Sequence, residues 1–445
     1  MIDLHSKTYG FVSLGCDKNR VDAEKLLASI SARGMQITDD VSKAQVLIIN
    51  TCAFLNEARK EAIETVLEFS AYKSGNLEKI VVTGCLPQKY SAETFPELTE
   101  ADVFLGTEDY DKFFEALQKS YEVGRINSVG CGEGLYSSDR LVTTPLHYAY
   151  LKIADGCNNR CTYCLIPKIR GAYRSYPIED LLKEAGNLGE VSELVLVAQD
   201  VTRYGLDLYG QKKLTEFLQN VTKLVNINSV RLLYCYPDMI DDELIAEIRD
   251  NPKIVKYLDI PLQHSENGIL KLMNRPQGRE EYLRLIKKLR ENIPEIALRT
   301  TFIAGFPSET EEQFQGLKSF LNEAQFDNCG FFAYSREPDT PAYKLKEQIS
   351  YSVKKRRVKE LYAVQSEISR KKLSDRIGKI LTVLCDGIDY DKNCFVGRAY
   401  FQAPEIDGKV YFNARSAVQG EYYEVLIESC GAYDLYGRTE DYENE

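Results

Sequence analysis

Three cysteines within eight residues are the most reactive feature of the sequence. They are Cys157, Cys161 and Cys164, in the run Ala154-Asp155-Gly156-Cys157-Asn158-Asn159-Arg160-Cys161-Thr162-Tyr163-Cys164. Their C-x3-C-x2-C spacing lets one short loop present three thiolates. Iron–sulfur cubes are normally held by four cysteinates, so a loop of three leaves one iron open to another ligand. A structural zinc site would need a second cysteine pair or a histidine nearby. We therefore interpret the three cysteines as ligands of a 4Fe-4S cluster.

A second set of cysteines follows three apolar runs that are typical of buried strands. Cys16 follows residues 8–14, Cys52 follows residues 46–49 and Cys85 follows residues 80–82, with helical patterns at residues 21–30 and 57–69 between them. This strand–helix alternation predicts a parallel sheet, whose carboxyl edge binds ligands. We expect the three cysteines to converge at that edge; the alternative is that they are ordinary core cysteines. Cys131 lacks partners at ligand spacing and is expected to be structural.

The central motif resembles that of the radical S-adenosylmethionine (SAM) enzymes, with the aromatic Tyr163 just before the last cysteine. The flanking segments, residues 147–153 and Ile169-Arg170-Gly171, are similar to the methylthiotransferase branch of that superfamily. The resemblance implies that the open iron of the central cluster binds the amino and carboxylate groups of SAM. It also implies a second 4Fe-4S cluster on Cys16, Cys52 and Cys85, again with one free iron. Two clusters and SAM are therefore the expected cofactors.

Length and pattern predict three domains in a chain of 445 residues. The first, residues 1–135, is expected to be a doubly wound parallel-sheet domain. Residues 145–373 contain six strand patterns alternating with helices, which indicates a partial (β/α)6 barrel of the radical SAM type. Residues 376–440 contain five short strand patterns, which indicate a small β-barrel similar to the TRAM module of methylthiotransferases. We read residues 109–144 as a less patterned connection to the second domain.

Barrel active sites lie at the carboxyl ends of the strands. Gln199 and Asp200 follow the second expected strand of the barrel, although a helix-entry turn with a cap would also explain them. His264, after the fourth strand, is expected to be a structural histidine. Gly305 is similar to the glycine of the superfamily's strand beside the SAM adenine, so the resemblance adds Arg299, Ile303 and Gly305 as SAM contacts.

Charge distinguishes between partners. The chain carries a formal −11 at pH 7, and its end from residue 376 has seven basic and thirteen acidic residues, a formal −6. A negative module repels phosphates and attracts a basic protein. The run Lys354-Lys355-Arg356-Arg357, on a helix expected at residues 351–373, is interpreted as a solvated face. The segment of residues 397–408 is also similar to the branch that modifies a ribosomal protein.

The leading hypothesis is therefore an enzyme that adds a methylthio group to the β-carbon of an aspartate in the small-subunit ribosomal protein number twelve. One alternative is methylthiolation of a tRNA adenosine, which uses the same cysteines. Another is a non-catalytic iron–sulfur redox protein, but such proteins usually close all four iron positions with their own ligands. A flavodoxin- or ferredoxin-type electron donor is expected, and the sulfur donor stays open. Without a signal sequence or an apolar run of membrane length, the chain is expected in the cytoplasm.

Overall fold

A computed structural model describes residues 2–132, 134 and 137–442. The chain forms two compact units. The first comprises residues 1–143, 155–158 and 164–188, and the second comprises residues 144–154, 159–163 and 189–445. Each unit is described by itself. Among the described residues, none of the helices combines the length and the apolar composition needed to span a membrane.

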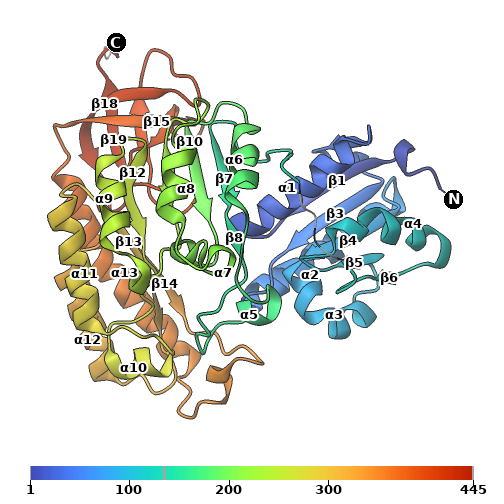
Figure 1. The fold of residues 1–445 in the computed structure, drawn as a ribbon, viewed down its shortest axis with the longest axis horizontal. Coiled ribbons are helices and arrows are strands. Elements are labelled where there is room, and N and C mark those ends of the chain that lie inside the picture. Colours follow the sequence, from blue (N-terminus) through green and yellow to red (C-terminus); the bar gives the residue numbers. More distant parts are fainter. Residues whose placement is uncertain (1, 133, 135–136, 443–445) are drawn as a thin grey trace. The chain divides into compact units, whose positions relative to one another are not determined.

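The first unit is built on a six-stranded parallel sheet in the order β2-β1-β3-β4-β5-β6 (Figure 1). Its strands are β1 (Thr8–Ser13), β2 (Gln36–Thr38), β3 (Val46–Thr51), β4 (Lys79–Gly84), β5 (Val103–Leu105) and β6 (Ile126–Asn127). Its helices are α1 (Asp17–Ser31), α2 (Asn56–Ser70), α3 (Cys85–Glu97), α4 (Phe113–Val123), α5 (Ile166–Ile169) and α6 (Ile178–Gly186).

Both faces of this sheet are covered by helices. Leu26 and Ile30 of α1 and Phe113 of α4 pack with strand residues in one core. Val66 of α2 and Leu86 of α3 pack in a second core, which also contains Leu165 and Ile169 of the α5 segment. Strand β3 is buried along its whole length, as a central parallel strand covered on both faces must be. The expected doubly wound domain is confirmed.

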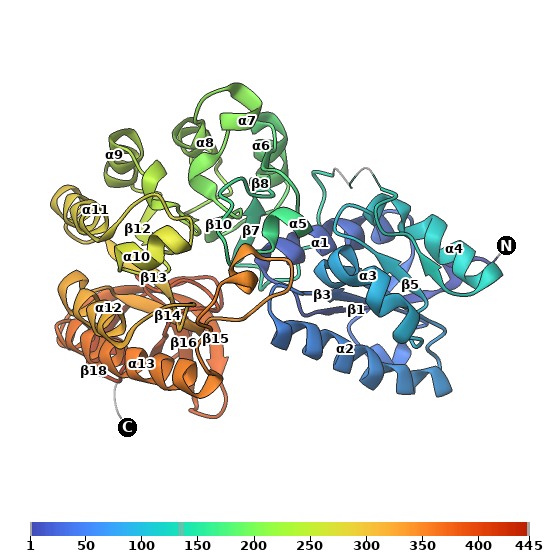
Figure 2. The same cartoon turned by 90° about the horizontal axis from the view of Figure 1, so that it is seen from below.

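The second unit contains a six-stranded parallel sheet in which the strands follow their order in the chain. They are β7 (Tyr148–Lys152), β10 (Glu193–Val197), β11 (Val230–Leu232), β12 (Ile254–Asp259), β13 (Ala297–Ala304) and β14 (Asn328–Ala333). Helices lie around the outer side of these strands (Figure 2). They include α8 (Leu214–Val221), α9 (Asp242–Asp250), α11 (Arg279–Asn292), α12 (Glu311–Ala324) and α13 (Tyr351–Ser374), with the shorter α7 (Leu206–Tyr209) and α10 (Asn267–Leu272). This is the expected partial barrel.

The chain ends in a closed five-stranded barrel in the order β15-β16-β17-β19-β18. Its strands are β15 (Ile380–Asp389), β16 (Cys394–Arg398), β17 (Val410–Asn413), β18 (Tyr422–Cys430) and β19 (Leu435–Thr439). All five were expected from the sequence. Two short strands remain outside the three sheets, β8 (Ala154–Asp155) and β9 (Arg174–Ser175), which flank the central cysteine loop in sequence.

Two expectations need correction. The segment from residue 109 is not simply a connection, because β6 within it belongs to the first sheet and α4 packs against that sheet. The basic run on α13 is not wholly solvated: Lys354 and Arg357 are buried, while Lys355 and Arg356 are exposed. The buried Lys354 donates to the Tyr334 carbonyl at 2.9 Å, and Arg357 pairs with Glu309 at 2.8 Å. Positions three apart lie on one helix face, which here is the inner one.

Candidate active site

The first three cysteines lie at one edge of the N-terminal sheet. Cys16 is the N-cap of α1 just after β1, Cys52 directly follows β3, and Cys85 is the first residue of α3 after β4. Strands β1, β3 and β4 are neighbours in the sheet, so their carboxyl ends bring the three thiols together. Gly84 has φ +95°, and a Cβ there would lie 2.6 Å from the Thr51 carbonyl oxygen. Only glycine fits at this close approach before Cys85.

The environment of this edge disfavours free thiolates. Burial raises the pKa of the Cys52 thiol to about 12, and the neighbouring Cys85 and Cys16 raise it further. Thiolates must form before a metal can bind, so three thiols that oppose each other's ionisation suit a positively charged centre. Among the described residues, no three Cys, His, Asp or Glu side chains are arranged for a single metal ion. An iron–sulfur cube does not need this arrangement, because each of its three thiolates binds a different iron.

The central loop is shaped by its backbone. Gly156 has φ +75°, and a Cβ there would lie 2.0 Å from the Ala172 carbonyl oxygen, so glycine is required before Cys157. The Cys157 amide donates to the Gly171 carbonyl at 3.2 Å, and the Cys164 sulfur accepts from the Ile166 amide at 3.4 Å. Cys157 and Cys164 belong to the first unit and Cys161 to the second. Their separation is limited by the short chain between them.

Cys161 has a polar environment within the second unit. Its sulfur is 3.5 Å from the Tyr236 hydroxyl and 3.9 Å from Nη1 of the buried Arg275. The Arg275 guanidinium also lies over the Tyr236 ring, 4.0 Å from its centroid. The neighbouring Thr162 donates its amide to the Met273 carbonyl and its hydroxyl to the Leu272 carbonyl. A guanidinium and a hydroxyl beside a cysteine sulfur restrict its orientation, as outer-shell groups do for metal ligands.

Asp200 supports the central loop from the end of β10. The buried carboxylate accepts from Asn159 Nδ2 at 3.0 Å, and Asn159 lies between two of the central cysteines in the chain. It also accepts from the Thr202 amide, which is the cap interaction that the sequence left open. Burial raises the pKa of Asp200 above its ordinary value. Gln199 precedes it at the same strand end.

The expected SAM strand ends in a tightly held turn. Gly305 has φ +73° and follows β13, and its amide donates to Glu309 Oε2 at 2.6 Å. Glu309 is paired with Arg357 and lies 3.5 Å from Nε2 of the buried His264. This arrangement agrees with a structural role for His264.

Tyr163 and Ile303 both pack against the apolar cluster that contains Phe306. Arg299 lies elsewhere. Near the amino end of β13 its guanidinium pairs with Asp259 at 2.8 Å and with Asp407 at 3.3 Å. Because Gly305 is six residues further along, about 20 Å in an extended strand, this position does not support the SAM contact expected for Arg299.

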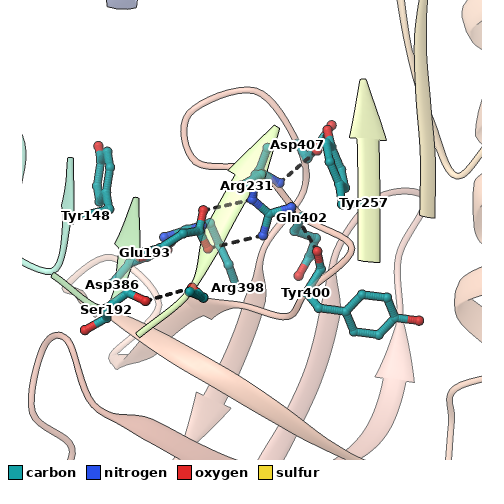
Figure 3. Close-up of polar contacts among 12 residues, drawn as sticks. Tyr148, Ser192, Glu193, Arg231, Tyr257, Asp386, Arg398, Tyr400, Gln402 and Asp407 are labelled. Carbon is teal, nitrogen blue, oxygen red and sulfur yellow. Dashed lines mark hydrogen bonds and ion pairs between the residues drawn. The ribbon is translucent and has the colours of Figure 1, made fainter. Parts of the chain in front are cut away.

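A buried polar cluster at the amino ends of the barrel strands was not anticipated (Figure 3). Glu193 accepts from Arg231 and from Arg398 of the C-terminal barrel, and Arg398 also pairs with Asp386. Beside it, Tyr257 donates to Asp407 at 2.7 Å. Nothing in the linear sequence indicates these pairs, since the partners lie up to 205 residues apart.

Known proteins resemble the chain over nearly its whole length. Family models match at residues 8–106 (Uncharacterized protein family UPF0004), 151–321 (Radical SAM superfamily) and 377–439 (TRAM domain). "Ribosomal protein uS12 methylthiotransferase RimO" of Lachnoclostridium phytofermentans is 45% identical over 97% of this chain and 99% of its own length. The protein of the same name from a Thermoanaerobacter species is 44% identical over 97% of this chain and 99% of its own length.

Solved structures share the fold. The radical SAM methyltransferase TsrM from Kitasatospora setae matches with a TM-score of 0.55 at 14% identity, over 76% of this chain and 77% of its own. The cobalamin-dependent radical SAM enzyme OxsB matches with a TM-score of 0.52 at 11% identity, over 81% of this chain and 58% of its own. At these identities the likeness concerns the fold alone.

Proposed function

Because the chain belongs to the family of RimO-type radical SAM methylthiotransferases, we propose that it adds a methylthio group to the β-carbon of an aspartate in ribosomal protein uS12. The observation that carries this proposal is the convergence of Cys16, Cys52 and Cys85 at one sheet edge, in a chain that also contains a radical SAM loop. A radical SAM enzyme without sulfur insertion needs only the loop. A second three-cysteine site provides a place to hold sulfur.

We propose two 4Fe-4S clusters, one on Cys157, Cys161 and Cys164 and the other on the three N-terminal cysteines. When bound, the central cluster and SAM supply the radical chemistry that activates an inert C–H bond. Arg275 and Tyr236 orient the Cys161 thiolate, and Asp200 holds the loop through Asn159.

For SAM itself we propose contacts from Tyr163, Gln199, Asp200, Ile303 and Gly305. The support for Gly305 is its place at the carboxyl end of β13, the end where barrel enzymes bind their ligands, in a turn that Glu309 fixes. Arg299 is omitted because two carboxylates hold its guanidinium near the opposite end of the strand.

The C-terminal barrel is proposed to dock the basic substrate protein. Several of its cations are not available to bind phosphate. Arg398 is buried against Glu193 and Asp386, Arg438 pairs with Glu428 at 2.8 Å, and Lys392 lies over the Tyr411 ring. Two of the thirteen acidic residues, Glu443 and Glu445, lie outside the described residues. The remaining charge still favours a basic protein over tRNA.

The cellular setting is proposed from the same family. We place the protein in the cytoplasm, where ribosomal proteins are modified, with a flavodoxin- or ferredoxin-type protein as the electron donor. The sulfur donor is a separate question that the chain's own residues do not address.

Mass spectrometry of both candidate substrates tests this function. Anaerobically reconstituted protein, SAM, a reductant and a sulfide source are incubated with uS12 and, separately, with unmodified tRNA. We expect a methylthio mass increase on one uS12 aspartate and none on tRNA. The matched control replaces Cys16, Cys52 and Cys85 by Ala; it should still release 5′-deoxyadenosine but leave uS12 unmodified. Methylthiolated adenosine with unmodified uS12 would contradict the proposal and favour the tRNA reaction.

A further inference from the structure

A buried arginine of the first unit lies next to the N-terminal cysteines. Arg170 follows α5, six positions after Cys164 in the chain, and only 3% of its side chain is exposed. A buried guanidinium is costly unless charged and polar partners surround it. The partners of Arg170 therefore show what this charge is used for.

Three side chains hold the guanidinium. Nη1 donates to Asp22 Oδ2 at 2.6 Å and to Asp155 Oδ2 at 2.9 Å, and Nη2 donates to Asn19 Oδ1. Burial alone would lower the pKa of Arg170, but Asp155 and Asp22 outweigh burial and raise it, so the charge is permanent. Asp155 accepts from the Gly156 amide just before Cys157, whereas Asn19 and Asp22 lie on α1.

Asn19 connects this charge to the cysteines. Its Nδ2 lies 3.6 Å from the Cys85 sulfur and donates to the Thr51 carbonyl at 2.9 Å, next to Cys52. Asn19 is in the first turn of α1, whose N-cap is Cys16. The Asn19 side chain thus contacts Cys85 and the residue before Cys52, on the helix that Cys16 caps, and Arg170 binds its amide oxygen.

We propose that Arg170 is a positioning residue for the N-terminal iron–sulfur site, where it holds Asn19 against Cys85 and offsets part of the negative charge that Asp22 and Asp155 place beside the cysteines. A cube with three thiolates and sulfide carries negative charge, and adding an electron increases it. A nearby cation stabilises the reduced state, and outer-shell charges and hydrogen bonds tune such potentials. Arginine suits this task better than lysine because its planar fork can bind Asp22, Asp155 and Asn19 together.

This inference rests on the proposed second cluster, so the test first establishes that cluster. The full-length chain with Cys157, Cys161 and Cys164 replaced by Ala serves as the background, because only the N-terminal cluster remains. After anaerobic reconstitution it should contain about four irons per chain, the content of one cube. Its midpoint potential is then measured by a redox titration followed by electron paramagnetic resonance.

Changes of charge should move this potential in opposite directions. Arg170→Gln removes a positive charge and should shift the midpoint to more negative values. Asp22→Asn removes a negative charge and should shift it to more positive values, and combining the two should largely cancel the shifts. Arg170→Lys keeps the charge but loses the fork, and should shift the midpoint less than Arg170→Gln does. Arg140→Gln is the matched control, since Arg140 is equally buried but pairs with Glu24 and Glu184.

The outcomes separate the two proposals. A background without iron would overturn the second cluster, and the inference with it. A background with iron whose midpoint is the same in Arg170→Gln and Asp22→Asn would overturn the inference alone. If Arg170→Gln loses its iron, retention of iron by Arg170→Lys supports the role of the charge. If both Arg170 variants lose their iron, the midpoint potentials of Asp22→Asn and Asn19→Asp provide the test. The inference fails unless Asp22→Asn shifts the midpoint to more positive values and Asn19→Asp shifts it to more negative values.

Discussion

Replacing Glu193 by Gln should destabilise the second unit markedly. Glu193 begins β10, and its carboxylate accepts from Arg231 Nε at 2.8 Å and from Arg398 Nη1 at 3.1 Å (Figure 3). All three side chains are at most 6% exposed. Arg398 comes from the C-terminal barrel, so the Glu193 carboxylate links that barrel to the strands of the partial barrel. A neutral amide would leave two buried guanidinium groups without their shared counter-charge.

The magnitude follows from the pKa of Glu193. Burial alone would raise this pKa, but Arg231 and Arg398 overcome burial and lower it from 4.5 to about 2. A difference of about 2.5 units corresponds to about 3 kcal/mol, at 1.36 kcal/mol per unit. This agrees with the 3–5 kcal/mol typical for removing one partner of a buried ion pair. Because the folded pKa is depressed, the stabilisation is complete above about pH 4.5 and disappears as the pH falls towards 2.

The assay is urea unfolding of the reconstituted protein under anaerobic conditions. Circular dichroism is the suitable signal, since the chain contains no tryptophan. Glu193→Gln is compared with Glu291→Gln, which breaks an exposed pair with Lys287 and should cost no more than about 0.5 kcal/mol. Adding Arg398→Gln to Glu193→Gln should cost less than the sum of the two single losses. The reasoning is refuted if Glu193→Gln costs under about 0.5 kcal/mol at pH 7, or if its effect does not shrink on acidification.

Three further predictions concern the cysteine sites and the substrate. Replacing Cys157, Cys161 and Cys164 by Ala should leave about four of about eight irons per chain, and iron analysis showing all eight would contradict the central site. Gly84→Ala should reduce iron at the N-terminal site only, because its Cβ would lie 2.6 Å from the Thr51 oxygen; full iron content in this variant would contradict the geometry. The affinity for uS12, measured by titration, should decrease between 0.1 M and 1 M salt, because the Debye length falls from ~10 Å to ~3 Å. It should be lost without residues 376–445; salt-independent binding would contradict electrostatic docking.

The sequence was most informative where a residue's role follows from its place on a parallel strand. The first four residues of β3, 46–49, are an unbroken apolar run, so its carboxyl end, and with it Cys52, could be located from the letters alone. The same holds for Cys85 after β4. Strands β5 and β6 have only three and two residues, too few to show a period, and the helix between them was missed with them.

The polar residues that position the sites could not be predicted. Asn19 and Arg170 are 151 residues apart, and Arg398 and Glu193 are 205 apart, so no local period connects them. The basic run at 354–357 shows the same limit. Its charges predict a solvated face, but Lys354 and Arg357 face inwards because Tyr334 and Glu309 offer them partners. Partners supplied by tertiary structure decide such cases, and charge alone does not.

Three of the loops to which we assign a role in the reaction have a buried arginine that contacts a residue in the loop or one that holds the loop in place. Arg170 contacts Asp155 and Asn19, Arg275 contacts Cys161, and Arg357 holds the carboxylate that fixes the Gly305 turn. Loops at the ends of parallel strands lack neighbouring strands to bind their backbone, so side chains must do so. Replacing an entire buried ion pair by apolar residues is often neutral or stabilising, so stability alone does not explain these charges. Their contacts do: a rigid, multidentate guanidinium fixes several groups at once, and the proposed chemistry requires reacting groups that are held in a fixed geometry.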